Sequence, residues 1–112
     1  MPRYQLSVHA EKLRKSFFRT PDPYAVVTIA GGPLSGTEVG RTETISNALN
    51  PDWTTLLYIE TDASVNMPLT VAIWDDRGGG EDRLLGEAQF EATTIFQSPG
   101  RIQKQSLAGG GR

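Results

Sequence analysis

The chain has 112 residues, of which 38% are hydrophobic and 21% are charged, and its formal net charge is -2. This length suits one domain, and the slight negative charge gives no overall attraction to nucleic acid or anionic lipid, so any such attraction needs a local patch. The absence of cysteine and the presence of one histidine, His9, exclude disulfides, thiol chemistry and multi-histidine metal sites.

Neither a secretory leader nor a membrane span is expected. The first residues lack the apolar region of a signal peptide, and no apolar run approaches the roughly 18 residues that a transmembrane helix needs. We therefore expect a cytoplasmic protein.

Short segments rich in β-branched residues alternate with turn residues, which is typical of an all-β antiparallel sandwich. In chain order the predicted strands are 4–10, 24–30, 41–45, 53–60, 69–74, 84–90 and 101–107. The segment 24–30 is apolar on both faces, which predicts a central strand, and Trp53 and Trp74 lie in strand positions that are expected to face the core. A short helical turn is expected over 92–96. These six or seven strands leave a sandwich one or two strands short, so a terminal strand is either missing or supplied by a partner chain. Residues 1–108 form the expected domain, and the glycine-rich residues 109–112 are interpreted as a tail or linker.

Acidic residues gather in loops that should emerge at one end of such a sandwich. The loop 75–83 holds four acids around a glycine triplet, and the loop 16–23 contributes Asp22. Carboxylates on adjacent flexible loops suit Ca²⁺, which takes six to eight oxygen ligands in irregular geometry. The alternative is that these acids are ordinary solvated turn residues.

Four motifs resemble the C2 domain family in order and spacing. They are the Asp-Pro-Tyr segment within 13–27, Leu-Asn-Pro-Asp-Trp at 49–53, the segment 71–76, and Leu-Leu-Gly-Glu at 84–87. The resemblance implies a C2-type Greek-key β-sandwich. It also implies a non-enzymatic, peripheral membrane module that binds anionic phospholipid through its calcium loops. The first loop, 15–23, is most similar to the N-terminal C2 domains of HECT-type ubiquitin ligases.

The resemblance also implies a set of calcium ligands, with departures. The matching positions are Asp22, Asp75, Asp76 and Asp82. Ser16 stands where the family has a first-loop aspartate, and Arg77 stands where it has a third-loop aspartate, unless Asp76 takes that role. Both departures should weaken calcium binding, since Arg77 or Arg83 can neutralise the acids without an ion, and one weakly held ion is expected rather than two or three.

Lipid contacts are implied for the tip of the first loop. Lys15 and Arg19 would meet anionic headgroups, while Phe17 and Phe18 supply an aromatic wedge, one ring of which could instead cover the core. The family's second lipid site is a lysine-rich strand. The corresponding residues 40–47 hold one arginine and one glutamate, which disfavours phosphoinositide binding there.

Two functional classes remain open from the sequence. The leading hypothesis is a membrane-targeting module with weakened calcium binding. The alternative is a calcium-independent protein-interaction or autoinhibitory domain of a larger protein, which Ser16 and Arg77 favour. A hydrolytic enzyme is disfavoured, because the sequence offers no nucleophile–histidine pair and small sandwiches offer no deep pocket.

Overall fold

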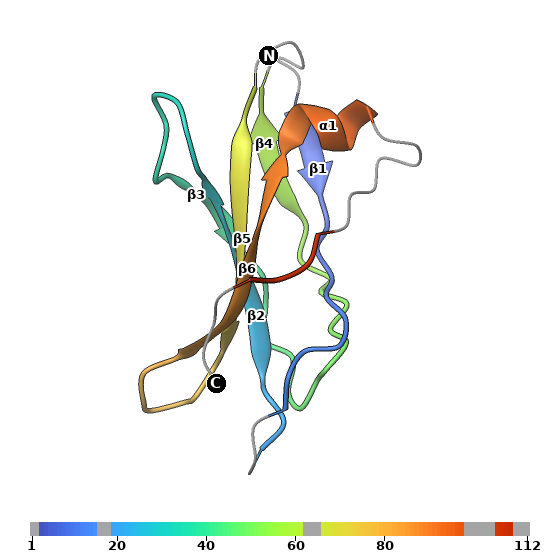
Figure 1. Cartoon of the computed structure of the whole chain (residues 1–112), viewed down its shortest axis with the longest axis vertical. Coiled ribbons are helices and arrows are strands. Elements are labelled where there is room, and N and C mark those ends of the chain that lie inside the picture. The colour runs from blue at the N-terminus through green and yellow to red at the C-terminus, as the bar shows by residue number, and fades with distance from the viewer. Residues whose placement is uncertain (1–2, 16–18, 62–65, 98–104, 109–112) are drawn as a thin grey trace.

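Six antiparallel strands and one short helix make up the fold in the computed structural model, which describes residues 3–15, 19–61, 66–97 and 105–108. The elements are β1 (Arg3–Leu6), β2 (Pro23–Ile29), β3 (Glu38–Arg41), β4 (Leu57–Glu60), β5 (Pro68–Asp75), β6 (Arg83–Glu91) and α1 (Ala92–Gln97). They form two layers, a four-stranded sheet in the order β3-β2-β5-β6 and a two-stranded sheet of β1 and β4 (Figure 1). The expected all-β sandwich is confirmed.

The strand β2 lies inside the larger sheet, as its apolar sequence predicts. It pairs with β3 on one side and with β5 on the other. Its residues alternate between fully and partly buried, with Ala25, Val27 and Ile29 facing the core. This alternation follows from the two-residue period of a strand and fixes which face of β2 meets the second layer.

The core lies between the two sheets and has two parts. In one part, Val27, Ile29 and Leu69 of the larger sheet pack with Leu57 and Ile59 of β4. In the other part, Leu13, Ala25, Trp53 and Ile73 pack together near the end of the sandwich at which β2 begins. The second part anchors long connecting segments, because Leu13 and Trp53 come from stretches outside the strands.

The predicted strand 41–45 is displaced in the structure, because β3 spans Glu38–Arg41 and shares only Arg41 with it, and the predicted strand 53–60 is shortened to Leu57–Glu60. The Thr42 hydroxyl accepts the backbone N–H of Ala25 at 2.8 Å, so regular pairing of β3 ends at Arg41. The Glu43 carboxylate accepts the backbone N–H groups of Thr54 and Thr55, so β4 begins only at Leu57. Side chains that bond to the backbone compete with the sheet in this way.

The predicted last strand is not found among the residues that the structure describes. Residues 105–107 have no strand pairing, and residues 101–104 lie outside the described ranges. Ala108 forms an isolated bridge with Glu87, in which each backbone N–H donates to the other residue's carbonyl at 2.9 Å. The helical turn predicted at 92–96 is confirmed as α1. The proposed tail, 109–112, lies outside the described ranges.

Candidate functional site

The connections before β2, before β4 and between β5 and β6 meet at one end of the sandwich (Figure 1). The backbone N–H of Asp76 donates to the carbonyl of Asp22 at 2.9 Å, and the N–H of Ala48 donates to the carbonyl of Pro21 at 3.0 Å. These bonds join the first connection to each of the other two. The prediction that the first and third loops emerge at the same end is confirmed, and we call this end the loop end.

A guanidinium lies among the carboxylates of the loop end. Nη2 of Arg19 is 3.2 Å from Oδ2 of Asp22, 2.9 Å from Oδ1 of Asp75 and 3.3 Å from the backbone carbonyl of Asp76. The Asp75 side chain is only 4% exposed, whereas the Arg19 and Asp22 side chains are about one-third exposed, at 35% and 31%. A single cationic nitrogen therefore connects three oxygens from two different loops.

Asp22 and Asp75 also bond to the backbone of the loops. Oδ1 of Asp75 accepts the N–H of Asp22 at 2.9 Å, and Oδ1 of Asp22 accepts the N–H of Asn47 at 2.8 Å. Asn47 has a φ of 52°, a left-handed conformation that asparagine tolerates better than most residues. The two carboxylates thus hold the three connections together through hydrogen bonds within the protein.

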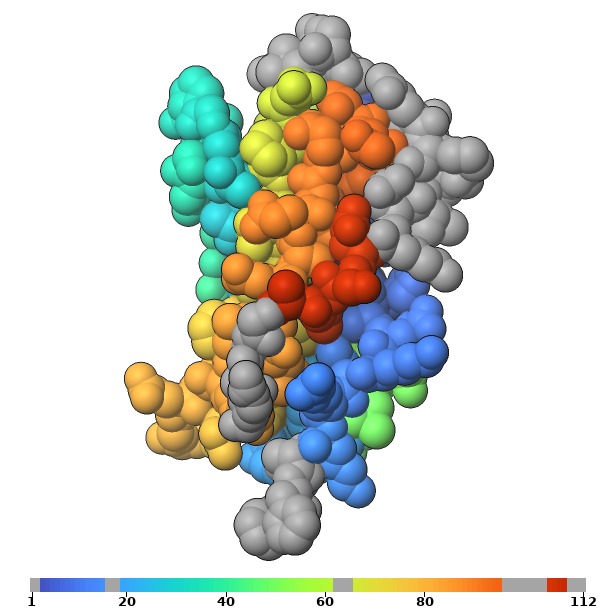
Figure 2. Space-filling model, viewed as in Figure 1, coloured from blue at the N-terminus to red at the C-terminus, as the bar shows by residue number. Residues whose placement is uncertain are grey.

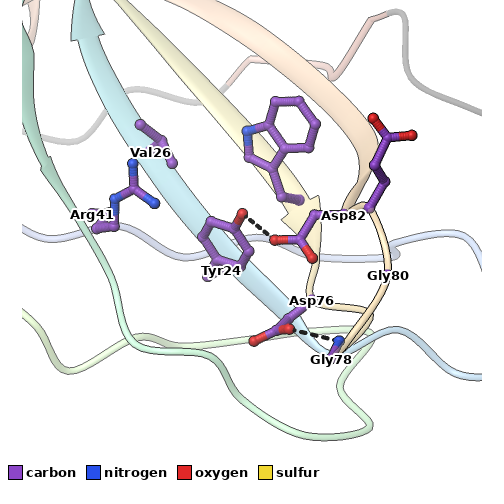
Figure 3. A pocket seen from close by; sticks show the side chains of 9 residues that line it. Tyr24, Val26, Arg41, Asp76, Gly78, Gly80 and Asp82 are labelled. Atoms are coloured by element: carbon purple, nitrogen blue, oxygen red, sulfur yellow. Dashed lines mark hydrogen bonds between the residues drawn. The ribbon is translucent and has the colours of Figure 1, made fainter.

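The other two predicted metal ligands, Asp76 and Asp82, have different partners. Asp76 accepts the Thr44 hydroxyl at 3.1 Å and the N–H of Gly78 at 3.0 Å. Asp82 accepts the Tyr24 hydroxyl at 2.6 Å (Figure 3). Burial and this hydrogen bond raise the pKa of Tyr24 to about 12. The same bond lowers the pKa of Asp82, so this aspartate is ionised at neutral pH.

Asp76 and Asp82 border an open pocket of about 610 Å³ on the larger sheet, beside the loop 76–82 (Figure 3). The lining residues are Tyr24, Val26, Arg41, Trp74, Asp76, Gly78, Gly80, Glu81 and Asp82. The sequence places Trp74 in the core, and this expectation is wrong, because the side chain is half-buried at the pocket. The matching expectation for Trp53 is confirmed, since it is 2% exposed and its indole N–H donates to the Pro23 carbonyl.

The four predicted metal ligands do not form one ligand set. Within the described ranges, no three acidic, histidine or cysteine side chains are grouped so that they could hold a metal ion. Asp22 and Asp75 already contact a guanidinium, and Asp82 is bonded to a phenol. Because Ca²⁺ requires six to eight oxygens at 2.3–2.6 Å, this arrangement does not fit the ion, and calcium binding stays a prediction.

The four predicted lipid contacts have different outcomes in the structure. Lys15 is exposed, as expected, and Arg19 is engaged with the aspartates. Phe17 and Phe18 lie outside the described residues, as does Ser16.

Sequence reasoning missed two further exposed cations, Lys12 and Arg14, which flank the buried Leu13. The signal was present in the sequence, because residues 12–19 contain four basic and no acidic residues.

The family follows from comparison with known proteins. A family model described as "C2 domain" matches residues 6–107. The chain is a C2 domain. Synaptotagmin-4 of Arabidopsis thaliana is 35% identical over 89 residues, which cover 80% of this chain and 15% of that protein. Tricalbin-2 of Saccharomyces cerevisiae is 35% identical over 77 residues, covering 69% of this chain and 6% of that protein. This C2 domain thus spans a small part of these relatives.

Solved structures support the fold of this C2 domain. The BON1-C2B structure has a TM-score of 0.70 at 22% identity, covering 85% of this chain and 67% of that one. A C2 domain of RIM from Drosophila has a TM-score of 0.68 at 20% identity, covering 80% of this chain and 74% of that one. The described part of this C2 domain has no helix with the length and apolarity of a membrane span.

Proposed function

We propose that this C2 domain is a cytoplasmic, peripheral membrane-targeting module that contacts anionic phospholipid with its loop end. The observation that carries the proposal is the placement of Lys12, Arg14 and Lys15. All three are exposed, while Leu13 between them is 6% exposed and packs with Trp53 in the core. The buried leucine fixes the segment to the domain, and its cationic neighbours are exposed. The N-terminal stretch that contains this segment, blue in Figure 2, lies on the surface of the molecule.

A local cationic segment can outweigh the chain's net charge of -2. Salt limits the reach of a surface charge to about 8 Å at physiological ionic strength, so a membrane responds mainly to the nearest charges. Each basic residue near an anionic surface contributes about 1 kcal/mol. Lys12, Arg14 and Lys15 supply this attraction, whereas the charge of Arg19 is largely offset by Asp22 and Asp75.

Vesicle sedimentation with and without phosphatidylserine tests the proposal, with chelator present to exclude calcium. We expect Lys15→Gln to weaken binding about fivefold, and the double variant Lys12→Gln/Lys15→Gln about thirtyfold, from about 1 kcal/mol per charge. The matched control is Arg3→Gln, which removes one charge from β1, at the opposite end of the sandwich in Figure 1. Equal binding by the double variant and the wild type would contradict the proposal.

A second candidate is a calcium-independent protein-interaction or autoinhibitory domain within a larger protein. The ion pairs of Arg19 with Asp22 and Asp75 favour it, because the loop end is already neutralised internally. A HECT-type ubiquitin ligase as the parent protein rests on the first-loop motif alone, since the relatives named above are a synaptotagmin and a tricalbin. Failure to bind any vesicle, with the domain folded, would favour this candidate.

A further inference from the structure

We propose that Arg19 is a tethered cation that takes the place of a metal ion at the loop end, so that the loops are held in position without calcium. This inference goes beyond the proposed function, because it concerns which cation orders the loops and not what the loops contact. It rests on the contacts of one guanidinium with Asp22, Asp75 and the carbonyl of Asp76.

Oxygens of the first and third loops converge on one nitrogen of the Arg19 guanidinium. Three oxygens from two different loops lie within 3.3 Å of Nη2 of Arg19. Two of them belong to carboxylates, and the third is a backbone carbonyl. Oxygens of these types around a single point of positive charge resemble part of the coordination of a hard cation. Here the charge is covalently attached to the first loop.

The Asp75 carboxylate is buried and therefore needs a partner. Its side chain is 4% exposed, and a buried carboxylate needs an opposite charge or hydrogen-bond donors to offset the loss of hydration. Arg19 provides the charge, and the N–H of Asp22 provides a further donor. Because the guanidinium is covalently attached to the first loop, this neutralisation does not depend on metal concentration.

The other two predicted metal ligands, Asp76 and Asp82, have partners of their own. Asp76 is bonded to Thr44 and Gly78, and Asp82 is bonded to Tyr24, so neither carboxylate is directed to the three oxygens around Arg19. An incoming calcium ion would have to displace a tethered cation and then find most of its ligands in water. We therefore expect the wild-type domain to show no calcium dependence at millimolar concentrations.

The decisive comparison is between Arg19→Gln and Arg77→Gln, measured as the midpoint of thermal unfolding, Tm, in chelator and in millimolar calcium chloride. Both variants remove one positive charge near the loop end, but Arg77 is exposed, and none of the described residues forms an ion pair with its guanidinium. In chelator we expect Arg19→Gln to lower Tm by about 4–8 °C, and Arg77→Gln to leave it unchanged. Calcium should restore part of the loss in Arg19→Gln, because the guanidinium no longer occupies the position between the three oxygens.

Calorimetric titration of the wild-type domain with calcium gives an independent test that needs no variant to fold. We expect no saturable heat and no calcium-induced rise in Tm. A saturable heat accompanied by a higher Tm would overturn the inference, as would an Arg19→Gln variant equal to Arg77→Gln in chelator. Failure of calcium to raise the Tm of Arg19→Gln would also overturn it, by showing that the oxygens do not accept a metal. Loss of vesicle binding would overturn only the proposed function.

Discussion

Glu43 stabilises the loop end as a single residue that joins two segments. Its carboxylate accepts the hydroxyl and the N–H of both Thr54 and Thr55, at distances from 2.6 to 3.2 Å. The side-chain bond from Thr55, followed by the bonds from Thr54, lowers the pKa of Glu43 to about 2. The sequence suggests only a polar strand residue here, because its partners come from a stretch 11 and 12 residues away.

Replacement of Glu43 should therefore lower the free energy of unfolding by an amount that depends on pH. Because the folded pKa is depressed, the ionised carboxylate stabilises the fold above about 4.5, and this contribution is lost as pH falls toward about 2. We expect Glu43→Gln to lower the free energy of unfolding by about 1 kcal/mol at neutral pH, and by less as pH falls through that window. Urea denaturation at several pH values measures this, with the exposed Glu87→Gln as control. A loss of unfolding free energy that does not change with pH would contradict the stabilising role of the ionised Glu43 carboxylate.

Tyr24 makes the stability of the fold depend on pH at the alkaline side, where stability falls as pH rises. Its raised pKa, about 12 against an ordinary 10.0, means that the protonated phenol stabilises the fold below pH 10, and this contribution disappears as pH rises toward 12. Tyr24→Phe removes the bond to Asp82 and should cost about 1 kcal/mol at neutral pH. It should also flatten the alkaline decline in stability, as measured by urea denaturation. The control is Tyr58→Phe, because Tyr58 is 44% exposed. An unchanged alkaline decline would exclude the role of Tyr24.

At the scale of elements, the packing of residues 105–108 against β6 depends on Gly86. A Cβ atom added at Gly86 would lie 2.9 Å from Cβ of Leu107, a contact too short to form without movement. We expect Gly86→Ala to lower the free energy of unfolding by about 1–3 kcal/mol, because the strand or the crossing segment must shift. The control is Gly79→Ala, whose added Cβ would meet nothing within 4 Å. Equal urea midpoints for the two variants would show that the crossing segment does not constrain β6.

At the scale of the whole molecule, the two layers bring distant charged residues to one end. Arg19 and Asp75 are 56 residues apart in sequence, yet their side chains are 2.9 Å apart. The net charge of -2 describes the molecule poorly, because charges that meet at the loop end cancel locally while Lys12, Arg14 and Lys15 remain exposed. The vesicle assay therefore tests a property of one surface and not of the overall charge.

Strand periodicity and four short motifs were sufficient to predict from the sequence alone the sandwich, its buried central strand and the family. Alternating burial in β2 is a local property, since successive side chains of a strand point to opposite faces. The sequence also indicated that acidic residues gather at one end, because strand direction determines where loops emerge.

Only the tertiary structure decided which charges meet. The sequence suggested Arg77 or Arg83 as the arginine that neutralises the acidic loops, but the guanidinium between Asp22 and Asp75 belongs to Arg19. Likewise, Asp82 bonds to Tyr24 across the sheet and not to the other acids. The physical reason is that a hydrogen bond forms only at a donor–acceptor distance of about 3 Å, so the partners depend on side-chain positions that the packing of distant segments sets.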